Sequence, residues 1–258
     1  MKINIITSPR MGSTYFYNML RNLYSPYQHF LRWNEVFNFN ERKPVHDVQQ
    51  IIHDAKTQTD VVAKNHITYF RELDPTQLND FLFNIDWYNI VLLRRNFFET
   101  SLSLARSKFT DEWTTYSNNK VTIPINIFQF SMDSIYHNIK NIVHNQYKIP
   151  YHDVIYYEDL VFNPREDFPK LKLEKSYDYD QYKKWYPEIR PFKHNRNIKP
   201  APSKKDTIEN YEELQQYAQS KYRTYKNKRF IIRDGYIRRI NWDTQYLDIN
   251  DFNMYNDN

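Results

Sequence analysis

The position of one glycine is the strongest constraint that this sequence places on its fold. The chain has 258 residues but only 2 glycines, and Gly12 lies in the segment Ile5-Ile6-Thr7-Ser8-Pro9-Arg10-Met11-Gly12-Ser13-Thr14-Tyr15. A short apolar run is followed by a turn and then by a stretch with helical spacing. A strand that turns directly into a helix presents backbone N–H groups and the helix dipole to an anion, and glycine lets the backbone approach closely. The segment therefore predicts a phosphate-binding loop, with an ordinary strand-to-helix turn as the alternative.

The bulk composition leaves the class of partner open. A formal net charge of +5 fits a protein that binds an anionic small molecule and equally fits a nucleic-acid binder. With no Cys and with 8 scattered His, the sequence contains no metal-ligand motif, and we expect no metal. We expect a cytoplasmic protein, because no signal peptide precedes the first strand and no apolar stretch approaches about 18 residues.

Apolar strand patterns and helical patterns alternate along most of the chain. Strands are expected at 2–7, near 28–37, and at 60–64, 88–93 and 153–157, and helices at 14–24, 46–56, 74–83, 97–108 and 127–146. This alternation predicts an α/β fold with a mainly parallel, doubly wound sheet flanked by helices. Ligands of such sheets bind beyond the carboxyl ends of the strands.

The C-terminal part has a different pattern. It predicts a helix near 206–219 and a hairpin of 229–233 and 236–240 that turns at Asp234-Gly235. We expect residues 1–220 to form one domain and residues 221–258 to form a hairpin extension packed on it.

The loop around Gly12 differs from that of nucleoside-triphosphate kinases. Ser13 stands where the Walker A motif has Lys, and the cation comes earlier, as Arg10. The strand 88–93 runs into Arg94-Arg95 rather than into a carboxylate. Both departures argue against a kinase and predict a phosphate site without bound Mg²⁺.

The same loop resembles the 5′-phosphosulfate loop of the sulfotransferases that use 3′-phosphoadenosine 5′-phosphosulfate (PAPS), a Pro-Lys/Arg-Ser-Gly-Thr/Ser-Thr-Trp pattern. Met11 replaces the usual small polar residue and Tyr15 the usual Trp, and neither change removes a backbone donor. The resemblance implies the P-loop-like sulfotransferase fold. It also implies that the cofactor PAPS, or its product adenosine 3′,5′-bisphosphate (PAP), contacts Pro9, Arg10, Met11, Gly12, Ser13, Thr14 and Tyr15.

A second segment resembles the part of this family that binds the 3′-phosphate. It runs Leu93-Arg94-Arg95-Asn96-Phe97-Phe98-Glu99-Thr100-Ser101-Leu102-Ser103, with Arg95 at the strand end and Ser103 eight residues on. An Arg fork and a Ser hydroxyl two helical turns away can converge on one phosphate. Arg94 is the competitor for the role of Arg95, and a solvated Arg pair is the alternative.

Two later segments extend the resemblance. Tyr156-Tyr157-Glu158-Asp159 is similar to the family's Tyr-Glu-Asp segment, which implies that Tyr157 lies near the adenine; a core aromatic is the alternative. The basic stretch 190–199 resembles the family's C-terminal phosphate clamp but lacks its glycine. Arg196 and Lys193 are its candidate phosphate contacts, and a solvated basic loop is the alternative.

The general base has two candidates, from different branches of the family. Val62-Ala63-Lys64-Asn65-His66 is similar to the Lys-Thr-His segment of cytosolic sulfotransferases, which implies His66 as base and places Lys64 near the sulfuryl group. A structural His is the alternative for His66. Asn34-Glu35-Val36-Phe37 resembles a segment of the heparan sulfate and several bacterial sulfotransferases, which implies Glu35. Neutral His accepts a proton near pH 7, whereas Glu benefits from a raised pKa in a dry pocket. We favour Glu35 slightly and keep both.

The resemblance implies an enzyme that transfers a sulfuryl group from PAPS to a hydroxyl or amine. Arg10 would hold the 5′-phosphate as it leaves, and Lys64 would neutralise the sulfuryl oxygens or the bridging oxygen. We expect a small-molecule or glycan acceptor, with neither nucleic acid nor membrane as partner; the oligomeric state is open. Aromatic residues such as Trp113, Tyr116, Phe128 and Phe130 are candidates for stacking on the acceptor, and core packing is the alternative. The alternatives are a P-loop kinase or phosphotransferase and a non-catalytic polyanion-binding protein.

Overall fold

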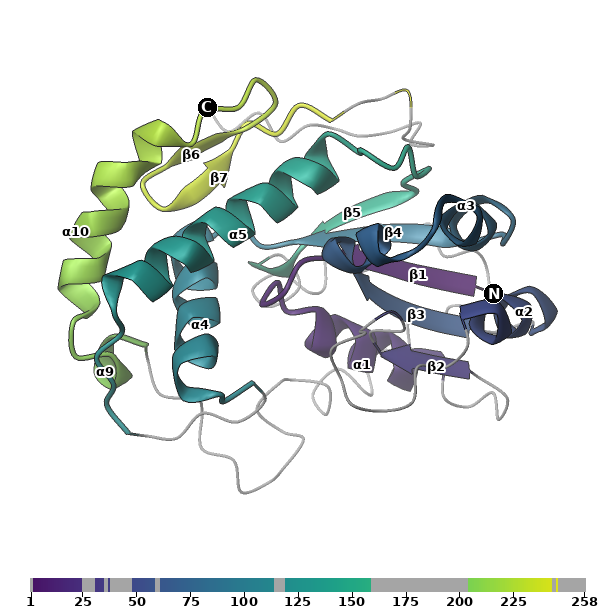
Figure 1. The fold of residues 1–258 in the computed structure, drawn as a ribbon, viewed down its shortest axis with the longest axis horizontal. Helices are drawn as coiled ribbons and strands as arrows, with labels where there is room; N and C mark the ends of the chain where they lie inside the picture. The colour runs from purple at the N-terminus through teal and green to yellow at the C-terminus, as the bar shows by residue number, and fades with distance from the viewer. Residues whose placement is uncertain are drawn as a thin grey trace.

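A five-stranded sheet forms the centre of the molecule (Figure 1). The structure is a computed structural model, and it describes residues 2–24, 31–34, 37, 48–58, 61–113, 119–158, 204–242 and 245. The strands are β1 (Lys2–Thr7), β2 (Leu31–Asn34), β3 (Val61–His66), β4 (Tyr88–Leu93) and β5 (Asp153–Tyr156). They lie in the order β2-β3-β1-β4-β5, and every neighbouring pair is parallel.

The strand order places a crevice at one edge of the sheet. After β1 the chain crosses to β2 on one side, and after β4 it continues to β5 on the other side. The register pairs Thr7 with His66 and Ile6 with Val91, so the carboxyl ends of β1, β3 and β4 lie level. A doubly wound sheet opens a crevice at such a switch point, between the ends of β1 and β4 here.

The central strands are apolar because they are covered on both faces. β3 is buried along its whole length, and β1 and β4 are buried except at their first residues. Three buried amides cross these strands: Asn65 donates to Asn4 and Asn4 to Asn89, both at 2.9 Å. Since a buried amide without partners costs about 1–3 kcal/mol, this chain of bonds favours a single strand register.

Helices flank the sheet. They are α1 (Ser13–Tyr24), α2 (Val48–Thr57), the 3₁₀ helix η1 (Ile67–Glu72), α3 (Pro75–Phe83), α4 (Phe97–Thr110) and α5 (Ile125–Val143). The start of α3 is a capping box of Asp74 and Gln77 with Pro75 at the first position. α1 packs on β1 and β3, and α4 packs along α5 (Figure 1).

The C-terminal elements pack beside α4 and α5 (Figure 1). They are α9 (Lys204–Thr207), α10 (Tyr211–Lys221), η3 (Tyr222–Thr224) and the antiparallel strands β6 (Ile231–Arg233) and β7 (Tyr236–Arg238). The hairpin turns at Asp234 and Gly235, both with positive φ, as a two-residue turn requires. Gly235 O accepts from Phe98 N at 3.1 Å and Arg95 O accepts from Ile237 N at 2.8 Å, so the hairpin docks on the start of α4.

The predicted fold class is confirmed: a parallel, doubly wound α/β sheet with a C-terminal hairpin. The single helix expected near 206–219 is wrong in detail, because Ile208–Asn210 separate α9 from α10. The division at residue 220 stays a prediction. In the described segments, no helix is long and apolar enough to cross a membrane.

Candidate active site

The loop after β1 has the backbone geometry of an anion-binding nest. Arg10 has φ 67° and Gly12 has φ 81°, whereas Met11 between them is not in the positive-φ region. Alternating φ signs turn successive N–H groups toward one side of the backbone, where they converge on an anion. Gly12 O accepts from Phe16 N at 3.1 Å, so α1 begins directly after the loop and adds its dipole.

Neighbouring elements hold this loop in place. Thr7 Oγ1 donates to Leu92 O at 3.0 Å, and Ser8 Oγ accepts from Asn138 Nδ2 of α5 at 3.0 Å. The Met11 side chain is fully buried in the hydrophobic core. This burial explains why an apolar residue can replace the small polar one of the sulfotransferase pattern: the side chain anchors the loop in the core.

Tyr157, directly after β5, lies against the loop. A Cβ at Gly12 would stand 2.0 Å from Tyr157 Cδ2, so the ring occupies the space that any side chain at position 12 would need. The ring also meets Tyr15 edge-on, with centroids 6.4 Å apart. Burial raises the pKa of the Tyr157 phenol. The predicted residues Gly12, Tyr15 and Tyr157 are thus brought together.

Glu158 caps the other predicted phosphate segment. Its two carboxylate oxygens accept from Arg95 N and Asn96 N, each at 2.9 Å, at the start of α4. Carboxylates are favourable at this end of a helix, where N–H groups lack helical partners. The motif that contains Glu158 does not indicate this role; the available signal was its place two residues after a strand.

Arg10 joins the loop to α4. Its Nε donates to Ser103 Oγ at 2.9 Å and its Nη1 donates to Trp113 O at 2.7 Å. Burial, and secondarily the charge of Arg94, lower the pKa of Arg10 to about 10. The two predicted residues Arg10 and Ser103, 93 positions apart, therefore form one site.

Arg94 and Arg95 point to different surroundings. The Arg94 guanidinium lies 5.2 Å from the Tyr157 ring centre, and its Nε is 3.9 Å from Glu158 Oε1. That Nε is buried and makes no hydrogen bond to the residues that the structure describes. The Arg95 guanidinium instead lies 4.0 Å from the centre of the Tyr156 ring. Of the two, Arg94 is thus the one beside Tyr157 and Arg10.

Lys204 is a third cation here, which the sequence analysis missed. Its Nζ donates to Glu99 O at 2.6 Å and to Glu99 Oε2 at 2.7 Å, and Tyr211 OH donates to Glu99 Oε1 at 3.0 Å. Burial and Arg94 lower the pKa of Lys204 to about 8, against the opposing effect of Glu99. No motif surrounds Lys204 in the sequence, and only the docking of α9 on α4 brings it into the site.

A second contact fixes α9 on α4. Arg106 Nη1 donates to Thr207 Oγ1 at 2.8 Å, one helical turn from Lys204. Glu99 and Arg106 are seven residues apart on α4, and hence lie on one face of that helix. The two contacts together hold Lys204 against the segment that carries Ser103.

Lys64 approaches the loop from β3. It is almost fully buried, and its Nζ donates to Thr14 Oγ1 at 3.2 Å. His66 lies at the end of the same strand, 7% exposed, and stacks on Tyr69 with centroids 5.2 Å apart. Lys64 and Thr14, each predicted to belong to the site, are thus in contact, and His66 lies opposite Thr7 at the edge of the crevice.

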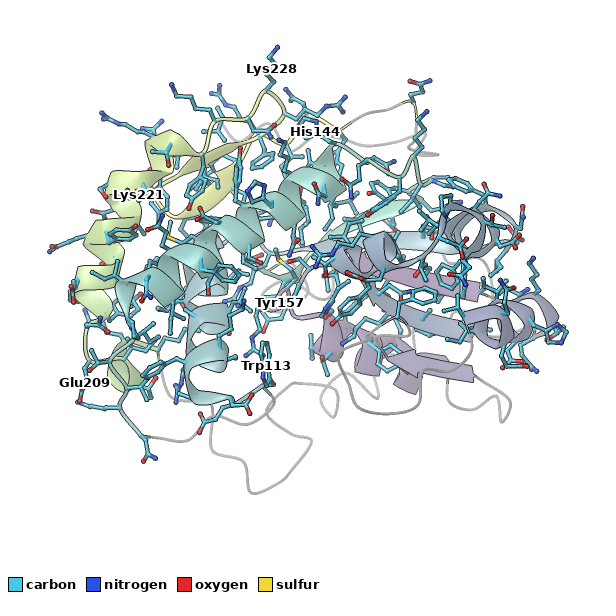
Figure 2. All side chains as sticks on the ribbon, viewed as in Figure 1. Trp113, His144, Tyr157, Glu209, Lys221 and Lys228 are labelled. Atoms are coloured by element: carbon cyan, nitrogen blue, oxygen red, sulfur yellow. The ribbon has the colours of Figure 1, made fainter. Side chains whose placement is uncertain are left out.

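Several predicted residues lie outside the described segments: Glu35, Lys193, Arg196 and Tyr116. Of the candidate stacking aromatics, Phe128 is buried in the core, whereas Trp113 and Phe130 are exposed. Figure 2 shows Tyr157 and Trp113 beside α4, on the side that faces the sheet. In the part of the chain that is described, no three His, Asp or Glu are grouped as metal ligands.

Comparisons with known proteins identify the fold. No protein-family model matches the sequence, and no curated protein matches it. Among solved structures, mouse sulfotransferase SULT7A1 complexed with PAP is similar with a TM-score of 0.54 and 9% identity, over 88% of this chain and 84% of that chain. The sulfotransferase domain from the curacin biosynthetic pathway matches with a TM-score of 0.35 and 15% identity, over 91% and 94% of the two chains.

The first of these likenesses shows a shared fold. The predicted P-loop-like sulfotransferase fold is therefore confirmed, and the chemistry depends on the site described above.

Proposed function

We infer that the protein is a sulfotransferase that moves a sulfuryl group from PAPS to a hydroxyl or amine of an acceptor. The observation that carries this inference is the hydrogen bond between Arg10 and Ser103. It joins the loop that resembles a 5′-phosphosulfate loop to the segment that resembles a 3′-phosphate site. The PAP-bound neighbour with the same fold supports it.

The charges of the site fit a nucleotide with two separate phosphate groups. The charge of Arg94 lowers the pKa of Arg10, and the charges of Arg94 and Arg10 lower the pKa of Lys204, so the three cations lie near one another. Like charges held in a buried place cost free energy, which a bound polyanion offsets. The buried Arg94 Nε, without a hydrogen-bond partner among the described residues, is a donor that such an anion would satisfy.

Each part of the site has a proposed role. The N–H groups of residues 12–14, with Arg10, hold the 5′-phosphate, and Arg94, Ser103 and Lys204 hold the 3′-phosphate. PAPS supplies the sulfuryl group when bound. Lys64 stabilises the negative charge that develops on the oxygens near the loop during transfer, as preorganised cations do.

The acceptor's proton goes to Glu35 or to His66. His66 lies at the carboxyl end of β3, beside the strand that leads into the loop. The single variants His66→Gln and Glu35→Gln distinguish the two candidates. The variant that lacks the base has a lower kcat, while its PAP affinity stays near the wild-type value. The other variant then retains most of the activity.

The direct test is formation of PAP and of a sulfated product from PAPS, with a panel of acceptors that includes phenols, neutral sugars, acidic polysaccharides and amines. We expect acceptor-dependent release of PAP without added divalent metal. If no acceptor in a broad panel is sulfated although the protein binds PAP, the inferred transferase activity is contradicted.

A further inference from the structure

The C-terminal hairpin and its approach form a strongly basic surface that the proposed chemistry does not use. Between residues 221 and 239 the sequence has one acid, Asp234, and eight bases. The bases are Lys221, Arg223, Lys226, Lys228, Arg229, Arg233, Arg238 and Arg239. This segment therefore has more net positive charge than the whole chain, whose formal net charge is +5. We call the surface formed by its exposed side chains the basic face.

The hairpin directs two of these bases outward around an aromatic ring. β6 pairs with β7 so that Ile232 lies opposite Ile237, and both are buried. Because side chains alternate along a strand, the neighbouring pairs point away from the core. These outward pairs are Arg233 opposite Tyr236 and Ile231 opposite Arg238, all four exposed. The Arg238 guanidinium lies 5.2 Å from the Tyr236 ring centre.

The basic face continues onto α5. Lys226 O accepts from Tyr136 OH at 2.8 Å, and Asn227 Oδ1 lies 3.1 Å from His144 Nε2. The loop that carries Lys226 and Lys228 is thus fixed along α5, beside the exposed Lys140. Figure 2 shows Lys228 extending outward from this loop with His144 beneath it.

The acid within the segment neutralises little of this charge. Asp234 lies 3.4 Å from Arg233 Nε, with side chains 78% and 80% exposed. An exposed pair of this kind contributes at most about 1 kcal/mol and is screened by salt. A cluster of exposed like charges attracts polyanions over about one Debye length, ~8 Å at physiological salt.

The basic face adjoins the candidate active site. Ile237 N donates to Arg95 O at 2.8 Å, and Asn96 Nδ2 donates to Tyr236 OH at 3.3 Å. Residues of β7 therefore contact the same junction between β4 and α4 that presents Arg94. A polymer bound along the hairpin would lie next to the site where the proposed transfer takes place.

We propose that the basic face binds an anionic polysaccharide whose sugar hydroxyls or amines are the acceptor. This proposal rests on the proposed sulfotransferase function and specifies its substrate class. A polysaccharide combines regularly spaced carboxylate or sulfate groups, which match the bases, with a free hydroxyl on most sugars. Its apolar ring faces also suit an exposed Tyr flanked by Arg, whereas DNA has no free hydroxyl along its chain.

Binding of the full-length protein to polygalacturonate, heparin, neutral dextran and single-stranded RNA tests the proposal. We expect an acidic polysaccharide to bind more tightly than RNA, with affinity that falls as NaCl rises, and dextran not to bind. Arg233→Ala/Arg238→Ala weakens this binding about tenfold, because each removed charge is worth roughly 0.7 kcal/mol at an exposed interface. The matched control is Lys120→Ala/Lys205→Ala near α9, at the opposite end of α10 from the hairpin, and it keeps wild-type affinity.

PAP binding, measured on the same variants, keeps the two claims separate. If the proposal is correct, the hairpin variant Arg233→Ala/Arg238→Ala binds PAP with the affinity of the wild type. If the wild type does not bind PAP, the proposed sulfotransferase function is contradicted instead. Tighter binding of RNA, or equal losses in the hairpin and control variants, would overturn the polysaccharide proposal.

One further outcome concerns the end of the chain. Residues 243–258 contain four Asp and no Lys or Arg. If polysaccharide binds only after Asp248, Asp251 and Asp257 are changed to Asn, the native chain does not bind this ligand and the proposal is overturned.

Discussion

The ring of Tyr157 lies so close to Gly12 that a methyl group at position 12 would stand 2.0 Å from Cδ2. Gly12 is thus required twice, once for its φ of +81° and once for this close approach. The contact couples the end of β5 to the loop after β1. Tyr157 and Glu158 together bridge the two predicted phosphate segments, because the Glu158 carboxylate caps the start of α4.

We predict that Gly12→Ala destabilises the protein and abolishes PAP binding. The left-handed conformation alone costs a residue with Cβ about 1–2 kcal/mol, and displacement of the Tyr157 ring adds to it. Chemical denaturation measures the loss of stability, and calorimetry measures the loss of PAP binding. Gly235→Ala is the matched control: its φ is +80°, but the nearest atom to its Cβ is 3.2 Å away. Equal destabilisation by the two substitutions would contradict the importance of the Tyr157 contact.

The two adjacent arginines should differ in their effect on nucleotide binding. Arg94→Gln is expected to weaken PAP about tenfold or more and to affect ADP, which has no 3′-phosphate, much less. Arg95→Gln, which removes a guanidinium stacked on Tyr156, is expected to change both affinities by similar small factors. If Arg95→Gln weakened PAP binding and left ADP binding unchanged, Arg95 would be the phosphate ligand, as the sequence motif implies, and the assignment to Arg94 would be wrong.

PAP affinity should depend on the protonation of Lys204. Because the pKa of Lys204 is about 8, its charge is lost as the pH rises through that value, and PAP binding weakens between pH 7 and 9. Lys204→Gln removes this dependence and binds PAP weakly throughout. Calorimetry at several pH values, in buffers of different ionisation enthalpy, also measures the protons taken up. A wild-type profile as flat as that of the variant would exclude Lys204 from the site.

The same pKa has a consequence for stability without ligand. The folded pKa of about 8 is below the ordinary 10.5, so between these values the unfolded chain holds more protons. The contribution of Lys204 to the free energy of unfolding therefore rises with pH across this window. The difference in the free energy of unfolding between the wild type and Lys204→Gln should therefore change with pH, which denaturation at several pH values measures.

Removal of the buried Lys64 ammonium group, which contacts Thr14, should lower turnover. Lys64→Ala, and likewise Arg10→Ala, is expected to lower kcat by roughly a hundredfold or more, since one preorganised donor contributes about 2.7–4 kcal/mol to the barrier. Lys56→Ala, at an exposed ion pair on α2, serves as the control. Near-normal turnover in a folded Lys64 variant would remove that residue from the mechanism.

Local patterns were sufficient to predict most of the fold. Buried parallel strands are continuous apolar runs, and Asp234-Gly235 specified a turn that the hairpin adopts. The break between α9 and α10 was missed because it depends on tertiary contacts: Val121 N donates to Thr207 O and Ile123 N to the side chain of Asn210.

Only part of the site could be predicted from the sequence. Motif spacing found Arg10, Ser103, Lys64 and Tyr157, because each lies in, or in the segment after, a strand whose end lies at the crevice. Lys204 comes from a helix more than a hundred residues beyond Glu99, its partner, and no local pattern encodes that contact. The choice between Arg94 and Arg95 depends on which way each side chain points at the strand end, which a spacing pattern does not specify.

The most direct test of the account is calorimetric titration of the full-length protein with PAP, with ADP and ATP·Mg²⁺ for comparison. We predict micromolar binding of PAP, clearly tighter than ADP, because in the proposed site Arg94, Ser103 and Lys204 hold the 3′-phosphate. No binding of PAP, or a preference for ATP·Mg²⁺, would contradict it and favour a nucleotide kinase.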